Sequence, residues 1–74
     1  MDDIRIFTSE TIPQYKIREY ILREYGEPDE RIFTRTNKLY NINRNTIKLV
    51  DEKDNVYIYT YNEETKEIKK ENQK

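Results

Sequence analysis

The clearest pattern in the chain is a strict alternation of residue types over residues 56–61, which is typical of a β-strand. Successive side chains of a strand point to opposite faces, so this strand has two faces of different character. The two sets are Tyr57, Tyr59 and Tyr61 on one face and Val56, Ile58 and Thr60 on the other. Rigid, amphipathic tyrosines are common in binding surfaces, so the pattern indicates binding rather than catalysis.

A helix is predicted over residues 12–25. Thr11 and Gln14 fit a capping box, in which each side chain accepts a hydrogen bond from the backbone N–H of the other residue. Gly26 is the only glycine of the chain and stands where a helix often ends in a left-handed conformation. Three apolar residues on one side of this helix are expected to anchor it on a sheet: Ile17, Ile21 and Tyr25.

The rest of the chain alternates between strand and turn signals. The predicted strands are Ile4–Thr8, Arg31–Thr36, Leu39–Asn43, Thr46–Val50, Val56–Tyr61 and Glu67–Lys70. The first two of the strands after the helix could also be one bent strand. The predicted fold is therefore α+β, with an N-terminal strand and one α-helix packed on a four- to five-stranded antiparallel meander sheet. Residues 1–70 would form a single small domain, and residues 71–74 a disordered tail.

The length of the loop between the predicted strands Thr46–Val50 and Val56–Tyr61 decides which face is buried. If residues 52–55 form the loop, Val50 lies opposite Tyr57 and Lys48 opposite Tyr59. A second loop over residues 63–66 would place Ile68 opposite Tyr61 and Lys70 opposite Tyr59. The core side is then Ile47, Leu49, Val56 and Ile58, and the tyrosines lie on the exposed side. A slip of one residue would reverse this assignment.

The residue inventory argues against catalysis. The chain has no Cys, no His and a single serine, Ser9, so no familiar nucleophile has a partnering base. One glycine excludes the glycine-rich phosphate loops, and residues 51–62 lack the glycine and final glutamate of an EF-hand. We therefore expect a protein that is not an enzyme and has no cofactor or metal. No segment is apolar enough to cross a membrane, so a cytoplasmic location is expected.

Charge is distributed unevenly, although the net charge is only −1. Residues 31–50 contain five basic residues and no acidic residue. In this alternative the chain binds nucleic acid, with base stacking on Tyr57, Tyr59 and Tyr61 and phosphate contacts from basic residues. The candidate nucleic-acid-binding residues are Arg35, Lys38, Arg44, Lys48 and Lys70. A sequence pI of 5.5 argues against this alternative.

The favoured hypothesis is a protein-interaction module that binds a host protein, or a second copy of itself, through the tyrosine face. The candidate partner-binding residues are Tyr57, Tyr59, Tyr61, Val50, Ile68 and Lys48. The absence of alanine and the abundance of Ile, Asn, Lys and Tyr suggest an A/T-rich genome. A small chain of this kind without catalytic groups is expected to be a phage or prophage accessory protein that inhibits or modulates a host protein.

Overall fold

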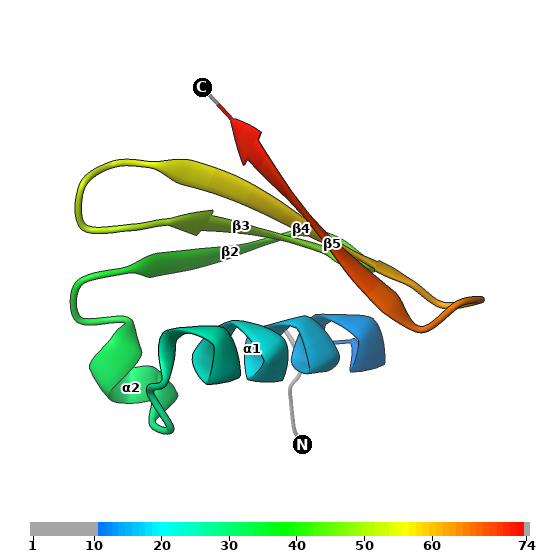
Figure 1. Cartoon of the computed structure of the whole chain (residues 1–74), viewed down its shortest axis with the longest axis horizontal. Coiled ribbons are helices and arrows are strands. Elements are labelled where there is room, and N and C mark those ends of the chain that lie inside the picture. Colours follow the sequence, from blue (N-terminus) through cyan, green and yellow to red (C-terminus); the bar gives the residue numbers. More distant parts are fainter. Residues whose placement is uncertain (1–10, 74) are drawn as a thin grey trace, which may run out of the picture.

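A computed structural model describes residues 11–73 of the chain. These residues form a small α+β fold with one main helix and a four-stranded antiparallel sheet, and Figure 1 shows their arrangement. The elements are α1 (Ile12–Tyr25), α2 (Glu30–Phe33), β2 (Lys38–Asn43), β3 (Thr46–Val50), β4 (Val56–Asn62) and β5 (Glu67–Gln73). The strands lie in the sheet in their sequence order, β2-β3-β4-β5. The predicted strand Ile4–Thr8 lies outside the described residues.

Helix α1 begins and ends where the sequence predicts. The Thr11 hydroxyl accepts from the Gln14 backbone N–H at 3.2 Å, and the Gln14 side-chain oxygen accepts from the Thr11 N–H at 2.9 Å. At the other end Gly26 has a φ of 72°, the left-handed conformation that glycine adopts without strain. Among residues 11–73, no helix is long and apolar enough to cross a membrane.

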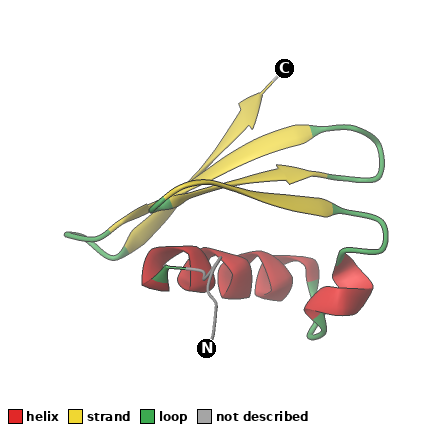
Figure 2. Ribbon diagram, turned by 180° about the vertical axis from the view of Figure 1, so that it is seen from behind, coloured by secondary structure: helices red, strands yellow, loops and turns green. Residues whose placement is uncertain are grey.

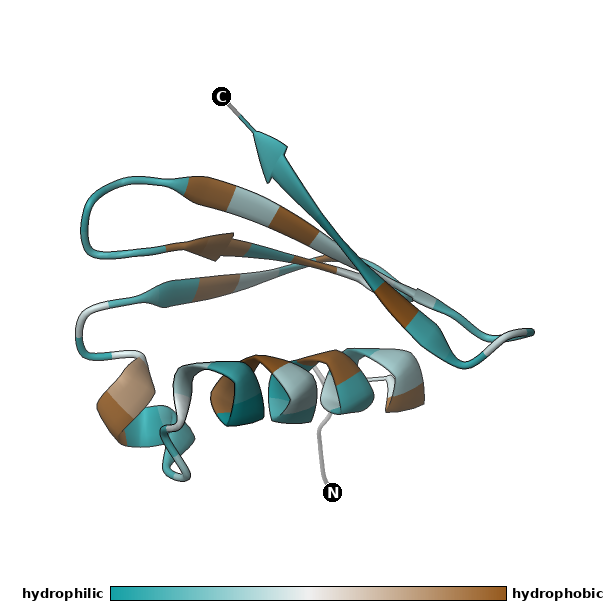
Figure 3. Ribbon diagram, in the orientation of Figure 1, coloured by the Kyte–Doolittle hydropathy of each residue, from teal (hydrophilic) through white to brown (hydrophobic). Residues whose placement is uncertain are grey.

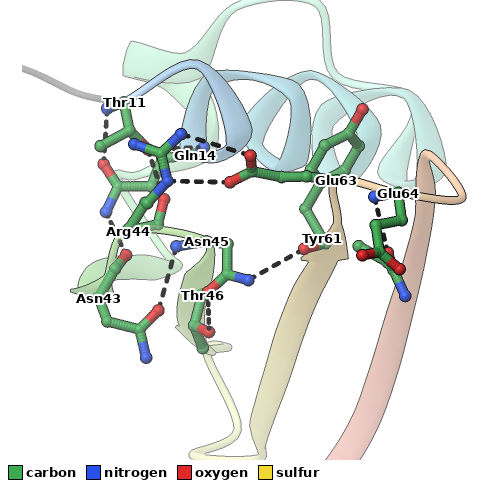
Figure 4. Close-up of polar contacts among 10 residues, drawn as sticks. Thr11, Gln14, Asn43, Arg44, Asn45, Thr46, Tyr61, Glu63 and Glu64 are labelled. Carbon is green, nitrogen blue, oxygen red and sulfur yellow. Dashed lines mark hydrogen bonds and ion pairs between the residues drawn. The ribbon is translucent and has the colours of Figure 1, made fainter.

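The same capping residues attach α1 to the sheet. The Thr11 hydroxyl donates to the Arg44 carbonyl, and the Gln14 side-chain amide donates to the Asn43 carbonyl at 2.6 Å (Figure 4). Both carbonyls lie at the tight connection between β2 and β3. The first turn of α1 is therefore fixed by its own cap and by the end of this hairpin.

Helix α2 replaces the strand that was predicted over Arg31–Thr36, so that prediction was wrong. The Asp29 side chain accepts from the Arg31 N–H at 2.9 Å and caps a single helical turn. Phe33 at the end of this turn is 4% exposed and packs edge-on against Tyr25, with ring centroids 5.1 Å apart. Tyr25 contacts α2 through this ring pair. Because its side chain is 42% exposed, it is not the buried anchor on the sheet that was predicted.

Strand β5 is longer than expected. It runs to Gln73, where Val56 is its partner in β4, so residues 71–73 belong to the sheet and not to a disordered tail. The predicted pairs of Tyr61 with Ile68 and Tyr59 with Lys70 are confirmed. At the other edge of the described sheet, the pairing of β2 with β3 shifts between Asn41 and Asn43 and leaves Ile42 as the extra residue of a bulge.

The β3–β4 register differs from the predicted one by one residue. Asp51 donates its backbone N–H to the Asn55 carbonyl at 3.0 Å, which leaves a loop of residues 52–54 in place of 52–55. Asp54 takes a φ of 66°, and the Asp51 carboxylate accepts from the N–H groups of Lys53 and Asn55 at 2.8 and 2.9 Å. Val50 consequently lies opposite Val56 instead of Tyr57.

This shift reverses the faces of β4 and β5, whereas Ile47 and Leu49 of β3 lie in the core as predicted. Tyr59 and Tyr61 are 0% and 6% exposed, so the expectation that they lie on an open face was wrong. They share the core with residues from α1, α2 and β3, namely Ile17, Ile21, Phe33, Ile47 and Leu49. Helix α1 contributes Ile17 and Ile21 to this buried set, and the tyrosine rings fill the remaining space between helix and sheet.

Candidate protein-binding face

The side of the sheet away from α1 is here called the open face. Its positions follow from the strand registers and are Lys38, Tyr40, Asn43, Thr46, Lys48, Val50, Val56, Ile58, Thr60, Asn62, Glu67, Lys69, Glu71 and Gln73, together with Ile42 at the bulge. In Figures 1 and 2, α1 and α2 both lie on the opposite side of the sheet. Within residues 11–73, no helix or strand covers the open face.

The open face contains a group of large apolar residues, which we call the apolar patch and define as Tyr40, Ile42, Val50, Val56 and Ile58. Tyr40 and Ile42 are 44% and 51% exposed. The three residues from β3 and β4 are half-buried by their neighbours in the sheet. The bands along β4 in Figure 3 alternate in hydropathy, and the register places its apolar residues on the open face and its tyrosines on the helix side.

A lysine lies in the middle of the apolar patch. Lys48 is on the inner strand β3, between Tyr40 on β2 and Ile58 on β4. Its ammonium group lies 5.3 Å from the centre of the Tyr40 ring, a cation–π contact. Among the described residues, Lys48 and Glu71 make no ion pair with another side chain. The open face thus combines exposed apolar area with unpaired charge.

The tyrosines on the helix side form a different cluster. The Tyr59 hydroxyl donates a hydrogen bond to the Glu24 carboxylate of α1 at 2.8 Å. Burial, and to a smaller extent this hydrogen bond, raises the pKa of Tyr59 well above its usual range. The Lys70 ammonium lies 3.6 Å from the same carboxylate and 4.6 Å from the centre of the Tyr57 ring. The Glu24 carboxylate therefore joins α1 to β4 and β5. These contacts give the tyrosine cluster a structural role in holding the helix on the sheet.

The predicted partner-binding residues do not share one surface. Val50 and Lys48 lie on the open face as expected. The other four, Tyr57, Tyr59, Tyr61 and Ile68, face α1. Tyr57 and Ile68 are half-buried at the margin of the core, whereas Tyr59 and Tyr61 are inside it. A binding surface centred on Tyr59 is thus incompatible with its burial.

The basic residues proposed for nucleic-acid binding are also separated. Lys38 and Lys48 lie on the open face, whereas Lys70 lies on the helix side beside Glu24. Arg44 is in the β2–β3 turn and pairs with Glu63 at 2.9 Å (Figure 4). Arg35 is exposed in the connection between α2 and β2. The cluster of charges along the sequence is therefore not a cluster in space.

Four residues of the apolar patch were absent from the predicted site, namely Tyr40, Ile42, Val56 and Ile58. The alternation that includes Val56 and Ile58 was visible in the sequence and showed that β4 has an apolar face and a tyrosine face. The missing information was the length of the β3–β4 loop, which decides the face that meets α1. The signal that would have given the correct register is Asp51, whose carboxylate accepts hydrogen bonds from the backbone N–H groups of Lys53 and Asn55 and so fixes the turn.

Comparisons of the chain with protein-family models, with curated proteins and with solved structures found no match.

Proposed function

We propose that this chain is a non-enzymatic protein-interaction module that binds its partner protein through the open face. The observation that carries the proposal is that the sheet has apolar side chains on both faces while α1 covers only one of them. A sheet with one solvated face ordinarily alternates apolar and polar residues. Here Val50, Val56 and Ile58 take positions where polar residues would be expected.

The composition of the open face suits a protein partner. An exposed aromatic residue, Tyr40, lies beside β-branched residues that lose little side-chain entropy when they are buried. Lys48 supplies a charge that could fix the orientation of the partner. A contiguous apolar surface rimmed by polar residues is typical of interaction sites.

Location and biological role belong to the same proposal. We place the protein in the cytoplasm and regard it as a phage or prophage accessory protein that inhibits or modulates a host protein. The support is the amino-acid composition, which indicates an A/T-rich genome, and the absence of Cys and His from the chain. The nucleic-acid alternative has less support, because its candidate residues are dispersed and two of them lie beside carboxylates.

The test compares two identical substitutions on different surfaces. Ile58→Lys places a charge in the middle of the apolar patch, and Ile12→Lys places one on the first turn of α1, where the side chain is 71% exposed. Proteins captured by the immobilised wild-type chain are identified, purified and titrated against all three chains. We expect Ile58→Lys to weaken direct binding by about tenfold or more and Ile12→Lys to leave it unchanged. Equal binding by the three chains would refute the proposal.

A further inference from the structure

The charges of the open face are arranged asymmetrically. On β2 and β3 the open face has two lysines, Lys38 and Lys48, and no acidic residue. On β5 it has two glutamates, Glu67 and Glu71, which flank Lys69. The apolar patch lies between these two charged margins. A partner that complements this face needs carboxylates over β2 and β3 and an ammonium group near β5.

A second copy of the chain meets this requirement. We propose that the open face binds the open face of a second copy, with the two-fold axis parallel to the strands and between β3 and β4. This inference rests on the proposed function and names its partner. Because the strand order is β2-β3-β4-β5, such a rotation places β2 of one copy across from β5 of the other. Sheets that pack face to face keep their strand directions within about 30° of each other.

The register identifies the residues that would meet. Tyr40, Lys48, Ile58 and Glu71 form one row across the four strands. In the dimer this row faces the same row reversed, so Glu71 of the second copy lies over Tyr40. The Lys48 ammonium is already held over the Tyr40 ring and would pair there with that carboxylate. In the adjacent row, Val50 of one copy would pack on Val56 of the other.

The other symmetric face-to-face arrangement has poorer complementarity. A two-fold axis perpendicular to the strands and centred on the row of Lys48 and Glu71 places β3 on β3 and β5 on β5, and so brings Lys48 to Lys48 and Glu71 to Glu71 of the second copy. Like charges that are brought together at an interface oppose association. The arrangement with the axis along the strands therefore has the better charge complementarity.

The expected affinity is modest. Four strands about 4.8 Å apart and five residues of about 3.3 Å give a projected footprint of about 300 Å² per copy. The two copies together give about 600 Å², which is below the roughly 1,200 Å² of standard specific interfaces and belongs to weak, transient contacts, so a micromolar or weaker dissociation constant is expected. Sedimentation equilibrium from about 10 µM to about 1 mM covers this range.

The test uses charge reversal at the two residues that would pair. Lys48→Glu and Glu71→Lys each replace two attractive contacts per dimer with two repulsive ones, and each should raise the dissociation constant by about tenfold. The double variant Lys48→Glu/Glu71→Lys should dimerise like the wild type. An equimolar mixture of the two single variants should also dimerise, because the mixed dimer has both pairs attractive.

The outcomes separate this inference from the proposed function. A wild-type chain that stays monomeric overturns the second copy as partner and leaves the open face available to another protein. A dimer that Ile58→Lys disrupts, but that the Lys48 and Glu71 variants leave unchanged, overturns the proposed pairing. A dimer that is indifferent to Ile58→Lys uses another surface and counts against both proposals. Binding of single-stranded oligothymidylate that weakens steeply with salt would instead support the nucleic-acid alternative.

Discussion

The Tyr59 hydroxyl donates a hydrogen bond to the Glu24 carboxylate at 2.8 Å, across the interface between β4 and α1. The Tyr59 ring is fully buried and also meets Tyr20 edge-on, with ring centroids 6.2 Å apart. A tyrosine is suited to this position because its ring fills the core while its hydroxyl reaches a polar group at the margin. The contact links a strand and a helix that are 35 residues apart in the sequence.

Replacing Tyr59 with Phe removes this hydroxyl and keeps the ring. The Glu24 carboxylate loses a donor but is partly exposed and retains Lys70 at 3.6 Å, so water can replace part of the interaction. We expect the free energy of unfolding to fall by about 1 kcal/mol, measured by urea denaturation. Tyr57→Phe is the matched control and should change stability by a few tenths of a kcal/mol, because the Tyr57 ring is half-exposed at the margin of the core.

Stability should also fall at alkaline pH because of Tyr59. Its pKa is raised in the folded state by burial and by the Glu24 hydrogen bond, while the unfolded chain ionises near the reference value of 10.0. The stabilisation is therefore fully present below about pH 10 and is lost as the pH rises above it, by about 1.4 kcal/mol per pH unit. Urea titrations of the wild type and Tyr59→Phe should converge in this range. Parallel pH profiles would show that Tyr59 is not protected from ionisation.

Adjacent alanine substitutions on β4 test the assignment of its two faces. Tyr59→Ala removes a fully buried ring and should cost about 3–5 kcal/mol or prevent folding. Ile58→Ala removes a half-buried side chain of the open face and should cost about 1 kcal/mol. Urea denaturation and circular dichroism measure both. The opposite order of costs would mean that the tyrosines lie outside the core.

Thr11→Val tests the cap of α1. Valine keeps the shape of threonine but removes the hydroxyl that accepts from Gln14 and donates to the Arg44 carbonyl. We expect a loss of about 1–2 kcal/mol in the free energy of unfolding. Thr11→Ser keeps the hydroxyl and should restore most of this loss. If serine and valine are equally destabilising, the hydroxyl has no role in the cap.

Sequence and structure agree best where the determinants are local. The bounds of α1 follow from Thr11, Gln14 and Gly26, whose effects act within one turn of the helix. The strands β2 to β5 were also located to within a few residues. Helix α2 was missed because a single capped turn has no periodicity, and Asp29 was the only strong signal for it.

The candidate site was harder to predict because it depends on register. Both faces of β4 are apolar enough to be core, so the pattern could not choose between Tyr59 and Ile58. The face that is buried depends on the length of the β3–β4 loop, which is one residue shorter than predicted. Hydrogen bonds to the Asp51 side chain stabilise the shorter loop. The proximity of Lys48 to Tyr40 likewise depends on the β2–β3 pairing, which composition and charge do not encode.

The sequential strand order has a consequence for folding kinetics. Each strand of the described sheet pairs with its neighbour in sequence, so every hairpin closes a short loop at low entropic cost. Hairpins of this kind form within microseconds, whereas α1 must close the longer connection to β3 and β4. We expect the hairpins to form first in competing registers, and the docking of α1 to select the register that buries Tyr59 and Tyr61. Docking of α1 would then be the step in folding that rejects sheets paired in a wrong register.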